Sequence, residues 1–115
     1  MFFSLIPGFR AAWWIGAAEK REKRNDTEGV LSACSEVLAI LDRLGVDIEA
    51  PWCRPAATEA LTGYCRAAIQ LGRRPEAMAL LSRWRDRYLP WLAAPLTFHE
   101  REQLQWFEDV LGGPP

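Results

Sequence analysis

The chain has 115 residues, of which 50% are hydrophobic and 25% are charged, and its formal net charge is −1. A chain of this length and composition predicts a single globular domain over residues 1–115, with enough apolar surface to form a core. A net charge so close to zero argues against a protein that binds nucleic acid or an anionic membrane through its overall charge.

The first part of the chain, residues 1–18, is apolar but interrupted by Pro7, Gly8 and Arg10. A transmembrane helix needs about 20 uninterrupted apolar residues, and a secretory signal needs a basic residue before its apolar run. We therefore expect a cytoplasmic protein with no membrane span. The apolar segment 1–8 then packs on the domain or on a neighbouring subunit, so the oligomeric state stays open. The alternative for this segment is a weak peripheral contact with a membrane.

Apolar spacing predicts a first helix that follows Pro7-Gly8 and ends at about Arg24, with Trp13 on its buried stripe and Trp14 outside that stripe. The segment 25–27 predicts a turn that supplies an N-cap to the second helix. This second helix has apolar residues at spacings of three and four, and Gly45 favours its end.

The longest connection is predicted over residues 46–55, which contain two prolines. A third helix then leads to Gly72, and a fourth begins around Pro75 and is ended or bent by Pro90. A fifth begins near Thr97, which is a suitable N-cap, and is followed by the tail 112–115. The predicted fold class is all-α, with about five antiparallel helices that form two hairpins and a C-terminal capping helix.

The second predicted hairpin resembles a tetratricopeptide repeat, in which two helices pack through small and large residues. Gly72, Ala77 and Leu81 match the glycine, the alanine and the bulky apolar residue of that pattern. Trp84 stands where a second alanine is usual, and Ala68 stands where an aromatic residue is usual. We expect these two departures to compensate in volume.

The first two predicted helices resemble a weaker copy of the same hairpin. Val30 and Cys34 follow Asn25 at the spacings by which the matching residues follow Gly72. The two turns lie 47 positions apart, whereas tetratricopeptide repeats recur at about 34. We expect the surplus to lie in the proline-containing loop.

Residues 26–111 are also similar to the helical-repeat domain of bacterial transcriptional activators. The similarity lies in the segment Ala50-Pro51-Trp52 and in the turn from Leu71 to Ala77. Those activators carry a separate DNA-binding winged helix, for which this sequence has no counterpart. The resemblance implies an interaction module, and any transcriptional role would belong to a partner.

The sequence offers few residues for catalysis or metal binding. His99 is its single histidine and lacks the second histidine of a zinc-binding helix. The three cysteines have no paired spacing, so we expect buried thiols rather than disulfides or a metal site. We predict that the protein is not an enzyme and binds no cofactor and no metal.

A groove is predicted where the first helix of each hairpin faces the concave side of the stack. Tryptophan and arginine dominate many binding surfaces, and tryptophans 52 and 91 are predicted at the edge of this groove. The predicted partner-binding residues are Trp14, Arg21, Trp52, Thr62, Arg66, Gln70, Arg73 and Trp91. The arginines of the second hairpin either bind an acidic partner or face the acidic second and fifth helices.

The predicted function is non-enzymatic binding of another protein. Within this class the sequence favours two roles, an immunity protein that neutralises a bacterial toxin or other effector, and an adaptor. The alternative is a regulatory protein associated with nucleic acid through the arginine-rich second hairpin, although the net charge disfavours such a partner.

Overall fold

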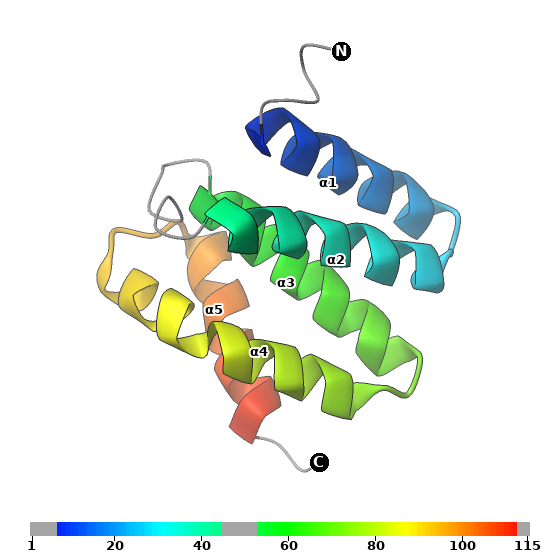
Figure 1. The fold of residues 1–115 in the computed structure, drawn as a ribbon. Coiled ribbons are helices and arrows are strands. Elements are labelled where there is room, and N and C mark those ends of the chain that lie inside the picture. The colour runs from blue at the N-terminus through cyan, green and yellow to red at the C-terminus, as the bar shows by residue number, and fades with distance from the viewer. Residues whose placement is uncertain (1–6, 45–52, 113–115) are drawn as a thin grey trace.

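The computed structural model describes residues 7–44 and 53–112, and the regular structure of these residues is entirely helical (Figure 1). The α-helices are α1 (Pro7–Lys23), α2 (Thr27–Leu44), α3 (Cys53–Gln70), α4 (Arg74–Tyr88) and α5 (Phe98–Gly112). A short 3-10 helix, η3 (Leu89–Ala93), follows α4 at Pro90. The predicted all-α fold class is confirmed. None of the described helices is long and apolar enough to cross a membrane.

The two hairpins, α1 with α2 and α3 with α4, turn through the same backbone motif. Asn25 and Gly72 have φ angles of 59° and 73°, the left-handed conformation in which many helices end. Two backbone hydrogen bonds close each turn. In the second hairpin the N–H of Gly72 donates to the carbonyl of Ile69 (3.0 Å), and the N–H of Arg73 donates to the carbonyl of Ala68 (2.7 Å). In the first hairpin the N–H of Asn25 donates to the carbonyl of Glu22 (3.0 Å), and the N–H of Asp26 donates to the carbonyl of Arg21 (2.8 Å).

The start of α5 is fixed by the N-cap that the sequence predicts. The backbone N–H of Glu100 donates to Thr97 Oγ1 at 3.1 Å, and the backbone N–H of Thr97 donates to Glu100 Oε1 at 3.3 Å. This reciprocal pair satisfies two N–H groups that a helix start leaves without partners.

The start of α3 differs from the prediction, because the helix begins at Cys53 and includes Pro55 in its first turn. The first four N–H groups of a helix have no partner within the helix, so a proline there removes no hydrogen bond. The rest of the predicted loop, together with the predicted stop at Gly45, lies outside the described residues.

Helix α3 is the centre of the molecule, because it contacts α1, α2, α4 and α5 (Figure 1). Most of its buried residues are small: Ala56, Ala57, Ala60, Cys65, Ala67 and Ala68. Its closest approach to a neighbour is at Gly63, where an added Cβ would lie 2.6 Å from Cys34 Sγ of α2. Small side chains therefore allow four helices to gather around one.

The two hairpins bury residues at equivalent positions, as a weaker internal copy would. The equivalent pairs are Trp14 and Leu61, Ala18 and Cys65, Val30 and Ala77, Cys34 and Leu81, and Val37 and Trp84; Trp14 packs against the core and the others are buried in it. The prediction that Trp13 lies on the buried stripe is wrong, because its side chain is 65% exposed. Successive helical residues point about 100° apart, so only one of the two tryptophans faces α2 and α3.

Removing Trp84 tests how much the second hairpin depends on this ring. Ala68 and Trp84 are both buried in the core, and we expect Trp84→Ala to lower the free energy of unfolding by about 3–5 kcal/mol. Trp13→Ala is the matched control, with an expected change within about 0.5 kcal/mol. Urea unfolding measures both variants. Equal effects of the two would contradict the assignment of Trp84 to the core.

Two glycine substitutions test the close approach of α2 and α3. Alanine is favoured over glycine inside a helix by about 0.5–1 kcal/mol, so Gly16→Ala, whose Cβ meets no atom within 4 Å, should stabilise the protein. Gly63→Ala should destabilise it by about 1–3 kcal/mol, because the new Cβ meets Cys34. Adding Cys34→Ala to Gly63→Ala should recover part of this loss. Equal gains from the two glycine substitutions would show that the helices are not in tight contact.

Candidate binding groove

A groove of about 360 Å³ lies between α1, α3 and the start of α5, and the first half of α2 completes its lining. The odd-numbered helices thus share one face, as predicted for a stack of hairpins. The lining residues of these three helices are Ile15, Ala18, Glu19 and Glu22 of α1, Glu59, Ala60, Thr62, Gly63, Arg66, Ala67 and Gln70 of α3, and His99 and Gln103 of α5.

The groove is acidic. Four carboxylates, those of Glu19, Glu22, Asp26 and Glu59, line it together with the single guanidinium of Arg66. Within the described part of the chain, neither Glu19 nor Glu22 forms an ion pair. The carboxylates therefore outnumber the guanidinium of Arg66 in the lining, and the groove disfavours an acidic partner.

Two polar side chains of the lining are buried. Thr62 is 5% exposed and donates its hydroxyl hydrogen to the carbonyl of Thr58 at 2.8 Å. Gln103 is 8% exposed, and its amide forms no hydrogen bond with any residue that the structure describes. The amide atoms of Gln103 are not among the buried side-chain atoms that lack a hydrogen-bond partner, so Gln103 offers a donor and an acceptor at the groove without destabilising the free protein.

Three of the predicted partner-binding residues, Thr62, Arg66 and Gln70, line the groove. Arg21 does not, because its guanidinium donates to the carbonyl of Gly29 at 2.9 Å and lies 5.9 Å from the ring centre of Trp14. Trp14 is likewise absent from the lining. The predicted groove lining is wrong for these two residues.

The remaining three predicted residues are not at the groove either. Arg73 forms an ion pair with Glu28 at 2.8 Å and points to α2. Trp91 is only 8% exposed, because η3 turns the chain back and buries the ring in the core. Trp91 therefore packs back on its own domain and does not form the predicted edge of the groove. Trp52 lies outside the described residues.

The groove residues that the sequence prediction missed include Glu19, Glu22, Glu59 and Gln103. A signal for the first two exists, because they follow Ile15 at helical spacing on one side of α1. The correct buried stripe of that helix, through Trp14 and not Trp13, would have identified that side. No local signal identifies Gln103, because its place depends on how α5 docks.

The arginines of the second hairpin pair with carboxylates of neighbouring helices. Besides Arg73, Arg87 pairs with Asp42 of α2 in a contact of 2.6 Å, and Arg85 pairs with Glu108 of α5 at 2.9 Å. The interpretation that these arginines face the acidic second and fifth helices is confirmed for these residues.

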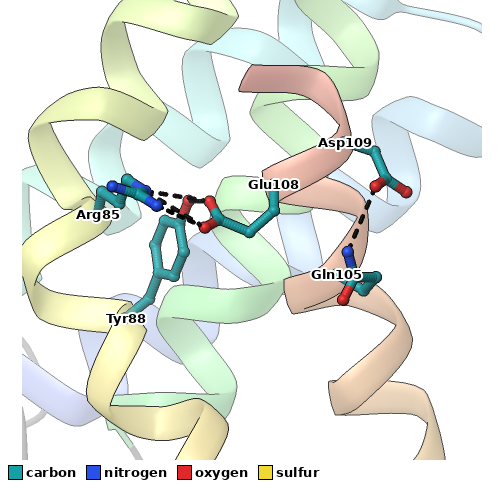
Figure 2. A network of polar contacts seen from close by, with 5 residues as sticks. All are labelled: Arg85, Tyr88, Gln105, Glu108 and Asp109. Carbon is teal, nitrogen blue, oxygen red and sulfur yellow. Dashed lines mark hydrogen bonds and ion pairs between the residues drawn. The ribbon is translucent and has the colours of Figure 1, made fainter. Parts of the chain in front are cut away.

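Charged contacts at both ends of α5 hold His99 and Gln103 beside α3. Near its start, Arg54 of α3 donates to Glu100 at 3.0 Å. Near its end, Glu108 accepts hydrogen bonds from Arg85 and from the hydroxyl of Tyr88, the latter at 2.8 Å (Figure 2).

These contacts change the acidity of the α5 carboxyl groups. The hydrogen bond from Arg85 holds the pKa of Glu108 below its ordinary value, and the bond from Tyr88 acts in the same direction. Burial opposes ionisation of Glu100, but hydrogen bonds from Thr97 and Arg54 outweigh it and lower the pKa of that group too. Both carboxylates are therefore ionised at neutral pH.

Burial raises the pKa values of the Cys34 and Cys65 thiols to about 12. Both groups are thus protonated at neutral pH, and neither is poised to act as a nucleophile. In the portion of the chain that the structure describes, no group of three or more His, Cys, Asp or Glu side chains is placed to hold a metal ion.

Comparison with models of protein families, with curated proteins and with solved structures gives no match to this chain. The resemblance to tetratricopeptide repeats therefore stays a prediction from the residue pattern. The hairpin that carries the pattern does bring its small residues together, with Cys65 Sγ 3.9 Å from the carbonyl oxygen of Ala77.

The Glu108 contacts predict a specific loss of stability in acid. Because the folded-state pKa of Glu108 is lowered, its stabilising contribution is present above the unfolded-state pKa and is lost as the pH falls through the folded-state pKa. Glu108→Gln removes this titration. Between about pH 5 and about pH 3, the variant should lose less free energy of unfolding than the wild type, as measured by urea unfolding. Parallel pH profiles would contradict the role of Glu108.

Proposed function

We propose that this protein is a non-enzymatic interaction module that binds another protein in the groove between α1, α3 and α5. The observation that supports this proposal is the charged and polar lining of the groove. Glu19 and Glu22 are exposed there without ion pairs among the described residues, and Gln103 lines the groove without a hydrogen bond to any of these residues. A bound partner would supply ion pairs and hydrogen bonds that the fold itself does not make.

Two roles fall within this proposal, an immunity protein that inhibits a toxin and an adaptor that joins two proteins. Both need only a surface that a partner covers, so the groove is common to them. The roles differ in a cellular test. An immunity protein restores growth when it is co-expressed with the toxin encoded beside it, whereas an adaptor does not.

The alternative, a regulator associated with nucleic acid, has less support. Arg73, Arg85 and Arg87 each pair with a carboxylate of a neighbouring helix. These pairs reduce the positive charge that the second hairpin offers to phosphate groups. The acidic groove would also repel a nucleic acid.

Blocking the groove tests the proposed function. Gln70 is exposed and lines the groove, so Gln70→Trp places a large side chain in it without changing the charge. Gln105→Trp on α5 is the matched control, because Gln105 is exposed and does not line the groove. In affinity capture from the native cell, we expect the control to retain the partner of the wild type and Gln70→Trp to lose it.

Two results of this capture would contradict the proposal. One is a partner that binds Gln70→Trp as well as it binds the wild type and the control. The other is the absence of any protein that binds the wild type above the level of empty resin. Circular dichroism of the three proteins checks that each is folded.

A further inference from the structure

We infer that the occupant of the groove is a basic protein segment, whose lysine or arginine side chains meet the carboxylates of α1 and α3 while its backbone meets Gln103. This inference rests on the proposed function, because it names the chemistry of the partner for the same groove. It adds the sign of the partner's charge and the contact that the partner's backbone makes, neither of which the proposed function specifies.

The charge of the groove lining determines the sign of the charge expected on the partner. Glu19 and Glu22 project from one side of the groove and Glu59 belongs to the other, while Arg66 is the one cation in the described lining. His99 Nε2 lies 3.8 Å from Glu59 Oε1, and both side chains are exposed. A concave surface with charges of one sign concentrates ions of the opposite sign. Cationic side chains therefore fit this groove, and anionic ones are repelled.

The apolar part of the lining favours long cationic side chains over a compact ion. Ile15 and Ala18 of α1 and Ala60 of α3 lie among the carboxylates. Lysine and arginine cover apolar surface with their methylene stems and keep their charged ends beside polar groups. A metal ion or a simple ammonium ion would leave this apolar surface uncovered.

The buried amide of Gln103 favours a polypeptide occupant. An amide side chain offers both donors and an acceptor, which matches the C=O and N–H groups of a peptide backbone. Gln103 is 8% exposed at the groove and has no hydrogen bond to any described residue. A polyamine could satisfy its oxygen but would offer no carbonyl to its NH₂ group. A peptide segment satisfies both.

Selection from a random-sequence peptide library tests the inference. We expect the peptides that bind the wild type to be enriched in lysine and arginine, and their binding to weaken as salt is added. The triple variant Glu19→Lys, Glu22→Lys and Glu59→Lys should instead select peptides enriched in aspartate and glutamate. The matched control is Glu36→Lys, Asp86→Lys and Glu102→Lys, which changes the net charge equally at exposed positions outside the lining. This control should still select basic peptides.

A second variant tests the buried amide without a change in charge. Gln103→Leu should weaken the binding of a selected basic peptide by about three- to tenfold. The same variant should unfold at about the same urea concentration as the wild type, because the substitution removes no hydrogen bond to a described residue. Unchanged peptide affinity, measured by isothermal titration calorimetry, would overturn the role of Gln103 in binding.

The outcomes separate this inference from the proposed function. If selected peptides bind the wild type and lose binding in Gln70→Trp, but are neutral or acidic, the inferred charge is wrong and the groove remains a docking site. If both triple variants lose basic peptides equally, overall charge rather than the groove selects them, and the inference is overturned. If no peptide binds and Gln70→Trp also captures the partner normally, the proposed function fails as well.

Discussion

The structure depends on the small side chains of α3, which let four other helices pack around a single helix. Alanines cover much of its buried surface, and Gly63 allows Cys34 of α2 to come so close that no Cβ would fit between them. Helices α1, α2 and α5 all contact α3. Because the buried side chains of α3 are small, these helices can lie close to its axis. The groove is the space that remains between α1, α3 and the start of α5, and the first half of α2 completes its lining.

Helix α5 is held in place by polar contacts at both ends as well as by apolar packing in its middle. Its middle is apolar, with Phe107 against Tyr88 at a ring-centre separation of 5.4 Å. Glu100 and Glu108 hold the two ends through Arg54, Arg85 and Tyr88 (Figure 2). These contacts keep Gln103 buried at the groove even though its amide gains no partner from the described residues. The contacts at the two ends of α5 thus fix the position of a groove residue that lies between them.

The helices can be predicted from the sequence because residues at their ends have strong local preferences for turns and caps. Gly72 and Thr97 act at the turn and at the cap where their residue types predict, and Pro90 ends α4. The groove was much less predictable, because its charge depends on contacts distant in sequence. Arg73 and Arg87 each pair with a carboxylate 45 positions away in the chain, so the pattern of arginines along the chain does not reveal the charge of the groove lining. The sequence prediction buried Trp13 in place of Trp14 for a local reason. Both tryptophans are apolar and adjacent in the chain, so either one fits an apolar stripe along α1.

We propose that the groove between α1, α3 and α5 receives a cationic polypeptide. A nuclear magnetic resonance titration of the isotope-labelled protein with a lysine-rich peptide measures this directly. We expect the side-chain amide of Gln103 and the backbone amides around Glu22 and Arg66 to shift together and saturate. Shifts confined to the outer surface of α4, around Ala79 and Ser82, with the Gln103 amide unmoved, would contradict it.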